Sequence, residues 1–174
     1  HVMLHELLSE LSLSANSLNA ISVSKGPGSY TGLRIGVSAA KGLCFALNIP
    51  LIALDTTEIL AHYAAVNTEH ATRILPMIDA RRMEVYTAHF DAEAKRITDD
   101  EAMVIDEQSF SDFAEEQVVL VGDGADKCRP FIHAKMQILS ILPNATMMFE
   151  PAMRSFQQKR FEDVAYFEPF YLKD

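Results

Sequence analysis

The sequence predicts an α/β protein built from two lobes. Between residues 20 and 65, β-rich apolar runs alternate with helical patterns in the order strand, helix, strand, helix, which is typical of a parallel sheet. A second set of strands begins near Thr72, with no repeat or low-complexity linker before it. We therefore assign residues 1–68 to an N-terminal lobe and residues 69–174 to a C-terminal lobe.

The N-terminal lobe is expected to begin with an amphipathic helix, because leucines recur at helical spacing at Leu4, Leu7, Leu8 and Leu11. A strand at residues 20–24 then leads through a glycine-rich turn into a long helix, which Thr31 is expected to cap and Asn48 to end. A buried strand at residues 51–54 and a helix at residues 56–65 complete this lobe.

The C-terminal lobe is expected to begin with a β-hairpin. Residues 74–78 and 83–90 are predicted as two strands around a polar turn, and residues 103–105 as an extension of their sheet. Further along, we expect a helix from residue 108, a strand at 118–121, a turn at 122–124, a helix up to residue 133 and a last helix at 154–161. The aromatic tail at residues 167–172 is predicted to pack on this lobe.

Charge and cysteine content narrow the range of functions. The 174-residue chain has 15 basic and 24 acidic residues, a net charge of −9, so it should repel nucleic acids and anionic membranes. The longest apolar stretch, residues 32–47, includes two cations and is too short to cross a bilayer. Cys44 and Cys128 lie far apart and are expected to be reduced thiols, which predicts a cytoplasmic protein.

A glycine-rich turn joins the first strand to the long helix. Glycines allow a close backbone approach, and the N–H groups at a helix start attract anions. The spacing matches neither standard nucleotide pattern. A P-loop ends in Gly-Lys-Ser or Gly-Lys-Thr, whereas Gly32 is followed by Leu33 and Arg34. The dinucleotide pattern has two residues before its last glycine, whereas three residues separate Gly28 from Gly32. The turn serves packing alone, or it is a weak nucleotide or anion site formed by Gly26, Gly28, Ser29, Thr31 and Arg34.

The long helix has small side chains at regular spacing, with Gly32, Gly36 and Ala40 on one stripe and further small residues on another. Interior glycines cost about 1 kcal/mol each relative to alanine, and small stripes let another backbone come close. The helix is either buried within its own lobe, or one stripe faces the sheet and the other a partner, beside the opening helix. The second alternative predicts an interface formed by Leu4, Leu7, Leu8, Leu11, Gly32, Ile35, Gly36, Ala39, Ala40 and Leu43.

Three segments carry a family resemblance: KGPGSYTGLRIGVSAAKGLCFALNIPLIALDTTEILA at residues 25–61, LPMIDARRMEVYTAHFD at 75–91 and FEDVAYFEPFYLKD at 161–174. They resemble the TsaB family, also called YeaZ. The resemblance implies the fold of actin, Hsp70 and the sugar kinases (ASKHA), with two lobes of mixed sheet and helices. Each lobe of that fold opens with three antiparallel strands, so we expect the first lobe's set to precede His1.

The resemblance also implies a function. It implies a non-catalytic subunit that forms a heterodimer with TsaD, which transfers a threonylcarbamoyl group to the adenosine next to the anticodon of tRNA. It further implies that the ATPase TsaE binds the pair, that the chain alone forms a homodimer, and that tRNA is contacted only indirectly. The metal-binding His-x-x-x-His pair of TsaD corresponds to Thr56 and Leu60 here, so we expect no catalytic residue, no metal and no cofactor.

Two enzymatic alternatives stay open. A phosphotransferase or ATPase of the same fold would use the glycine-rich turn for phosphate. A metal-dependent glycoprotease would need a bound metal, for which His1 and His5 supply only two ligands at helical spacing. The charged hairpin turn that contains Asp79 and Arg81 is either solvated or contacts a partner or nucleotide from the second lobe.

Overall fold

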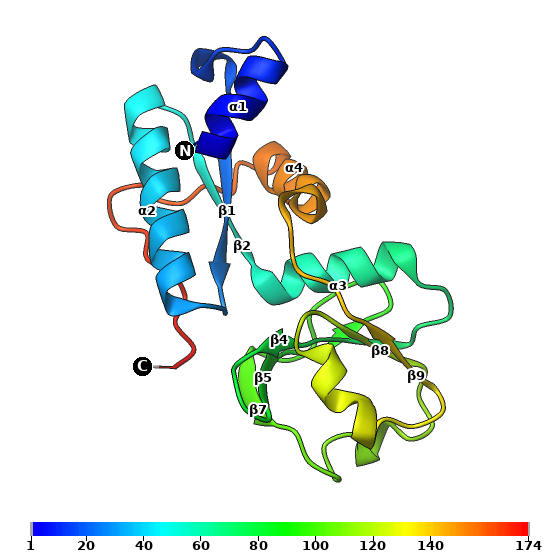
Figure 1. Ribbon diagram of the computed structural model, residues 1–174. Coiled ribbons are helices and arrows are strands. Elements are labelled where there is room, and N and C mark those ends of the chain that lie inside the picture. Colours follow the sequence, from blue (N-terminus) through cyan, green and yellow to red (C-terminus); the bar gives the residue numbers. More distant parts are fainter. Residues whose placement is uncertain (1, 174) are drawn as a thin grey trace.

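The computed structural model of the chain describes residues 2–173, and Figure 1 shows them as an upper and a lower part with one helix between. The upper part, the first lobe, holds α1 (Val2–Glu10), β1 (Ile21–Gly26), α2 (Tyr30–Leu47), β2 (Leu51–Asp55) and α4 (Phe149–Gln157). The lower part, the second lobe, holds β3 (Arg73–Pro76), β4 (Ile78–Asp79), β5 (Glu84–Thr87), β6 (Phe90–Asp91), β7 (Glu101–Val104), β8 (Val118–Val121) and β9 (Met136–Leu139). The helix between them is α3 (Thr56–Asn67). These elements confirm the predicted α/β class.

In the first lobe β1 and β2 pair in parallel, from Ile21 opposite Leu51 to Ser24 opposite Leu54. Two parallel strands need a crossover connection, and α2 supplies it, so the predicted strand–helix–strand unit is confirmed. The first strand is longer than expected, because its pairing with β2 continues to Gly26.

The ends of α2 follow local capping chemistry. The helix begins at Tyr30, and the side chain of Ser29 accepts a hydrogen bond from the Gly32 N–H. The prediction that Thr31 caps the helix was wrong, because Thr31 already lies inside the first turn. At the other end Asn48 adopts the left-handed conformation, which ends the helix where the sequence predicted.

The second lobe contains a four-stranded sheet in the order β6-β3-β8-β9. Strands β3, β8 and β9 are parallel, and β6 pairs antiparallel to β3 at its edge. All four residues of β8 are buried, as expected of a central parallel strand covered on both faces. The sequence analysis did not predict β9, although its residues form an apolar run.

A smaller antiparallel sheet has the order β4-β5-β7. The predicted hairpin is confirmed, since Ile78 pairs with Tyr86 and Asp79 with Val85 around the polar turn. The predicted third strand is also confirmed, as β7 pairs with β5. Each of the two expected hairpin strands is divided between the two sheets, because the chain passes from β3 to β4 and from β5 to β6 within a few residues.

Three helical predictions were wrong in extent or type. The expected helices after residue 108 and before residue 133 are short 3-10 segments at Ser111–Phe113 and Ala125–Phe131. Pro130 inside the second segment has no N–H for an α-helical hydrogen bond. The last helix spans Phe149–Gln157 rather than residues 154–161, because Lys159, with a positive φ of 54°, follows its end.

The chain after α4 returns to the first lobe. Glu162 N–H donates to the Leu51 carbonyl, and Val164 and Phe167 pack against the cluster that holds Cys44 of α2. The prediction that the aromatic tail packs on the second lobe was therefore wrong, because no local pattern reports such a long-range contact. The range 69–174 includes this returning segment, and the lobe boundary after residue 68 stays a prediction.

The largest buried cluster is shared by both lobes. Ile59 and Leu60 of α3 belong to one cluster with Ile52 of β2 above and with Ile74 and Val119 of β3 and β8 below. Because α3 contributes to the packing on both sides, it connects the two lobes through a shared core.

Candidate functional site

The first helix contributes nothing to the core. None of the residues Val2–Glu10 of α1 is buried. Leu4 and Leu8 are half-buried, whereas Leu7 is 52% exposed and Leu11, just after the helix, is 57% exposed. Isolated exposed leucines are ordinary, but an amphipathic helix without a buried residue leaves its apolar side uncovered.

One side of α2 covers the sheet of its own lobe. The buried side chains of the helix are Leu33, Val37, Ala40 and Cys44. Ala40 and Cys44 form a cluster with Leu51 of β2, against which the half-buried Ile21 and Val23 of β1 pack. This side therefore has a structural task that requires no partner.

The other side of α2 is made of small and aliphatic residues that its own lobe leaves at least partly uncovered. We call this surface the open face; it comprises Gly32, Ile35, Gly36, Ala39, Gly42, Leu43 and Ala46. Ile35 is 67% exposed, and Ala39 and Leu43 are half-buried. The helix is thus not sealed inside its lobe, and this excludes the alternative in which α2 is wholly buried within its own lobe.

Two of the three glycines of the open face, Gly36 and Gly42, are not required by packing within the described chain. A Cβ atom on Gly42 would meet nothing within 4 Å, and on Gly36 it would meet only Val23 Cγ2 at an ordinary 3.8 Å. Alanine at either position would stabilise the helix. The glycines are therefore better explained by a second backbone that approaches this surface closely.

One predicted interface residue is corrected by the structure. Ala40 is 5% exposed and packs in the core beneath α2, so its side chain is not available to a partner. The physical reason is that four residues turn an α-helix by about 40° more than a full turn. A stripe at four-residue spacing that begins at Gly32 on the open face therefore drifts to the sheet side by Ala40.

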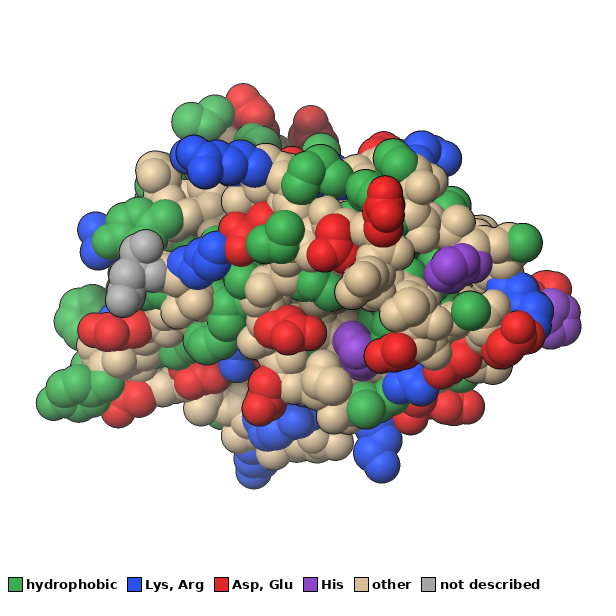
Figure 2. Space-filling model, turned by 90° about the horizontal axis from the view of Figure 1, so that it is seen from below, with side chains coloured by type: hydrophobic (Ala, Val, Ile, Leu, Met, Phe, Trp, Pro, Cys, Tyr) green, Lys and Arg blue, Asp and Glu red, His purple; other side chains and the backbone are tan. Residues whose placement is uncertain are grey.

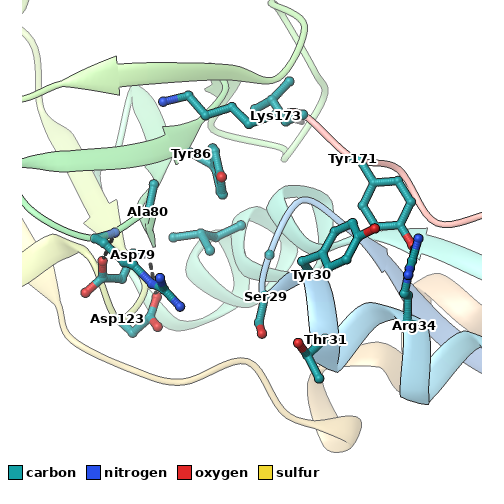
Figure 3. A pocket seen from close by; sticks show the side chains of 14 residues that line it. Ser29, Tyr30, Thr31, Arg34, Asp79, Ala80, Tyr86, Asp123, Tyr171 and Lys173 are labelled. Carbon is teal, nitrogen blue, oxygen red and sulfur yellow. Dashed lines mark hydrogen bonds between the residues drawn. The ribbon is translucent and has the colours of Figure 1, made fainter.

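A pocket of about 810 Å³ lies between the lobes (Figure 3). The start of α2, the β4–β5 hairpin, the turn at Asp123 and the C-terminal residues 171–173 line it. Four residues of the predicted anion turn reach this pocket, namely Gly28, Ser29, Thr31 and Arg34. The structure thus brings most of the predicted turn to one cavity.

Gly26, the fifth residue of the predicted anion turn, serves close packing instead. It is buried with a φ of +116°, and a Cβ atom there would lie 2.5 Å from the Phe170 carbonyl oxygen. Only glycine accommodates both the left-handed backbone and the close approach of the C-terminal segment. Its role is therefore to leave room for the backbone of the C-terminal segment.

The cation of the turn is already engaged by the protein. The Arg34 guanidinium lies 4.3 Å from the centre of the Tyr30 ring, and its Nε donates a hydrogen bond to Tyr171 Oη at 3.2 Å. The two tyrosine rings lie 4.9 Å apart, and Figure 3 shows all three side chains gathered on one wall of the pocket. Tyr30 and Tyr171 were not predicted as site residues, because Tyr171 lies 137 residues after Arg34 and no local pattern reports such a contact.

The opposite wall of the pocket carries both signs of charge, with Asp79, Arg81 and Asp123 among its lining residues. Asp123 Oδ1 accepts a hydrogen bond from the Asp79 N–H at 3.0 Å, which fastens the hairpin to the turn after β8. The Asp79 carboxylate accepts from Lys127 Nζ and from the Arg81 N–H, and the hydrogen bond from Lys127 holds the pKa of Asp79 below its usual value. The Asp79 side of the pocket is thus tied up by hydrogen bonds and an ion pair within the protein.

Thr56 and Leu60, the two positions that the family resemblance predicted to match the metal ligands of TsaD, take part in packing and hydrogen bonding within the chain. Thr56 Oγ1 shares a 2.7 Å hydrogen bond with Ser24 Oγ, and Leu60 is 0% exposed in the core. Among residues 2–173, no group of three or more His, Cys, Asp or Glu side chains is placed to hold a metal ion. The His1 and His5 pair, which the metal-dependent alternative would need, includes a residue outside the described range.

The surface seen in Figure 2 carries many acidic side chains, interspersed with single basic and hydrophobic ones. Within the described part of this face, basic side chains do not merge into a continuous area of the kind that tracks a nucleic-acid backbone. A search of the helices in residues 2–173 finds none that is both long and apolar enough to cross a membrane.

Comparison with known proteins gives consistent matches. The family model described as TsaD, tRNA N6-adenosine threonylcarbamoyltransferase, matches residues 1–174. The tRNA threonylcarbamoyladenosine biosynthesis protein TsaB of Haemophilus influenzae is 30% identical over 99% of this chain and 77% of its own length. The protein of the same name from Escherichia coli is 28% identical over 99% of this chain and 78% of its own length. The solved structure of YeaZ from Pseudomonas aeruginosa has a TM-score of 0.83 at 25% identity and covers 98% of this chain and 81% of the other.

The fold and these matches define a two-lobed α/β protein of the actin, Hsp70 and sugar-kinase class. The chain belongs to the TsaB (YeaZ) family, as the segments at residues 25–61, 75–91 and 161–174 predicted.

Proposed function

We propose that the chain is a non-catalytic subunit that pairs with a TsaD enzyme and activates it in forming threonylcarbamoyladenosine in tRNA. The observation that carries this proposal is the open face of α2, and α1 likewise has no buried residue. The names of the relatives from Haemophilus influenzae and Escherichia coli support the pathway. The matching family model, described as a threonylcarbamoyltransferase, supports the choice of partner.

Burial of apolar surface provides the driving force for pairing. Ile35 and Leu7 are more than half exposed, and removing such side chains from water stabilises a complex by about 25 cal/mol for each Å² of apolar area. The glycines of the open face allow a partner helix to approach closely, which increases the contact area. Helices from each protein would therefore form a joint bundle around α1 and α2.

The same surface also explains self-association. A chain without its partner would cover the open face with a second copy, because an exposed apolar surface of this kind seldom stays uncovered. We further propose that the ATPase TsaE binds the pair rather than this chain alone. The net charge of −9 makes direct tRNA contact unfavourable, so the positive surface for tRNA has to come from another subunit in the cytoplasm.

A transfer assay tests the activation. TsaD, tRNA and the threonylcarbamoyl-adenylate donor are incubated with and without the chain, and the modified adenosine is measured. Gly36→Leu crowds the open face, and we expect it to lower co-purification with TsaD and the stimulated rate by about tenfold or more, or at least 1.4 kcal/mol. A folded Gly36→Leu chain that still activates TsaD fully would remove the open face from the interface.

The control lies on the same helix. Ser38 is exposed but lies outside the open face, so Ser38→Leu adds a similar side chain at a place where no partner is expected. We expect this variant to pair and activate like the parent chain. Far-UV circular dichroism and the unfolding midpoint of both variants establish that they are folded.

The phosphotransferase alternative is not favoured, because Arg34 is engaged by two tyrosines and the facing wall carries Asp79 and Asp123. Calorimetry with ATP and magnesium separates the two functions. We expect no micromolar binding by the chain alone. Binding together with turnover would restore the alternative.

A further inference from the structure

The C-terminal segment lies along the first lobe and ends at the second. Glu162 begins it with a hydrogen bond from its N–H to the Leu51 carbonyl at 2.9 Å. Lys41 Nζ of α2 then donates to the Phe167 carbonyl at 2.8 Å, and the Phe170 N–H donates to the Lys25 carbonyl of β1 at 2.7 Å. These contacts fix the segment to β2, α2 and β1 in turn.

The last residues of the segment line the pocket between the lobes. The Tyr171 ring packs against Tyr30 and accepts the hydrogen bond from Arg34, both at the start of α2. Two residues later, Lys173 Nζ forms an ion pair with the Glu84 carboxylate of β5 in the second lobe. Figure 3 shows Tyr171 and Lys173 on the C-terminal segment, with Lys173 beside the strands of the second lobe.

The ion pair is placed where it contributes more than a fully solvated pair. The Glu84 side chain is only 21% exposed and that of Lys173 is 47% exposed. Fixed neighbours on both sides also reduce the freedom that the lysine loses, because Tyr171 is already held against α2. The segment is thus anchored both to the start of α2 and to β5.

The close contact between Gly26 and Phe170 indicates that the C-terminal segment packs tightly against the first lobe. The Phe170 carbonyl occupies the place where any other residue at position 26 would have its Cβ atom. The side of α2 that this segment covers is not the open face, so the segment and a partner helix can be present together.

We propose that residues 162–173 form a strap that locks the two lobes together, and that release of its last three residues opens the pocket between them. With the strap closed, Tyr171 and Lys173 connect the start of α2 to β5. With the strap open, α3 is left as the main connection, and the first turn of α2 loses its cover. The strap is a conformational device that sets the angle between the lobes.

Spin labels test the lock in the full chain. Ser38→Cys on α2 and Ala114→Cys in the second lobe are both exposed, and the native Cys44 and Cys128 are buried. Double electron–electron resonance then measures the distance between the two labels. For the doubly labelled parent we expect a narrow distribution, and with Tyr171→Ala and Lys173→Ala added we expect a broader one with a longer mean.

Two further variants sharpen the test. Tyr166→Ala changes a tail side chain that is 83% exposed, and we expect it to leave the distribution unchanged. The exchange of Lys173→Glu with Glu84→Lys keeps the ion pair with its charges reversed, and we expect it to keep the narrow distribution that Lys173→Glu alone loses.

Hydrogen exchange provides an independent readout. In the variant without both strap side chains we expect the amides at residues 31–35 to exchange about tenfold faster or more, while those of β8 stay unchanged. A folded variant with the parental label distance and parental exchange at the start of α2 would overturn the strap.

Discussion

The two long sides of α2 are both apolar, but they differ in what covers them. Toward the sheet, Leu33, Val37 and Cys44 are at most 8% exposed and pack against the first lobe. Away from the sheet, Ile35 is 67% exposed, and the glycines at 36 and 42 have room for a side chain. A helix with two apolar sides and only one covering layer is expected where the second layer comes from another molecule.

The helices α1 and α3 also differ in how far the rest of the chain covers them. Both are short apolar helices, yet six of the twelve residues of α3 are buried and none of the nine residues of α1 is. The difference cannot come from hydrophobicity, since both contain leucine and other apolar residues at helical spacing. It comes from position, because α3 lies between the lobes while α1 has no such neighbour.

The largest expected effect on stability comes from the covered side. Leu33→Ala removes a side chain that is 8% exposed and should lower the free energy of unfolding by about 2–4 kcal/mol. Urea denaturation followed by circular dichroism measures this loss. A loss well below about 1 kcal/mol would show that the two sides of α2 are less different than the structure indicates.

The uncovered side should respond in the opposite way. Ile35→Asp is expected to change the free energy of unfolding by no more than about 0.5 kcal/mol, but to weaken pairing with TsaD by about 2 kcal/mol or more. Calorimetric titration of the two proteins measures the affinity. The matched control is Val66→Asp, since Val66 on α3 is 68% exposed, close to the 67% of Ile35. Equal losses of affinity in the two variants would count against a specific face.

A substitution at Gly42 is expected to have a smaller effect, which raises stability but weakens pairing. Gly42→Ala should raise the free energy of unfolding by about 0.5–1 kcal/mol, because alanine is the better helix former and its Cβ atom meets nothing. The same methyl group should weaken pairing, because it lies on the open face. A variant that is both more stable and equally competent in pairing would mean that the partner does not approach this part of the helix.

The smallest expected effect is on the pH dependence of stability. It concerns an ion pair outside α2, between Asp79 and Lys127. The hydrogen bond from Lys127 lowers the folded-state pKa of Asp79, so this pair contributes stability above the ordinary carboxyl pKa of about 3.9. That stability is lost as pH falls through the lower folded value. Because Asp79 is 40% exposed, we expect less than about 1 kcal/mol. Unfolding curves of Asp79→Asn between pH 2 and 6 should show a correspondingly weaker acid dependence than the parent.

The sequence predicted those parts of the fold that depend on neighbouring residues. The unit from β1 to α3, the hairpin and β8 followed from periodicity and turn chemistry, and Asn48 ended α2 as expected. The tail and the extent of α4 were not predicted, because contacts such as Phe170 with Lys25 join distant parts of the chain. Local patterns do not report such contacts.

The candidate site was predictable to a similar degree. The small residues of α2 identified a helix made for close approach, but they did not reveal which side the sheet covers, so Ala40 was assigned to the wrong one. The glycine-rich turn was found, whereas its engagement by Tyr171 was not, because the tyrosine comes from the far end of the chain.

Cysteine footprinting tests the role of the open face most directly. Burial raises the pKa of Cys44, and that of Cys128 to about 11, so neither native thiol should react readily with a maleimide. Ile35→Cys and Val66→Cys each add one exposed thiol, and their labelling rates are compared at concentrations where the chain is monomeric, with and without TsaD. We expect TsaD to slow labelling at position 35 about tenfold or more and to leave position 66 unchanged. Equal labelling of position 35 in the free and the paired chain would contradict the assignment of this face to the partner.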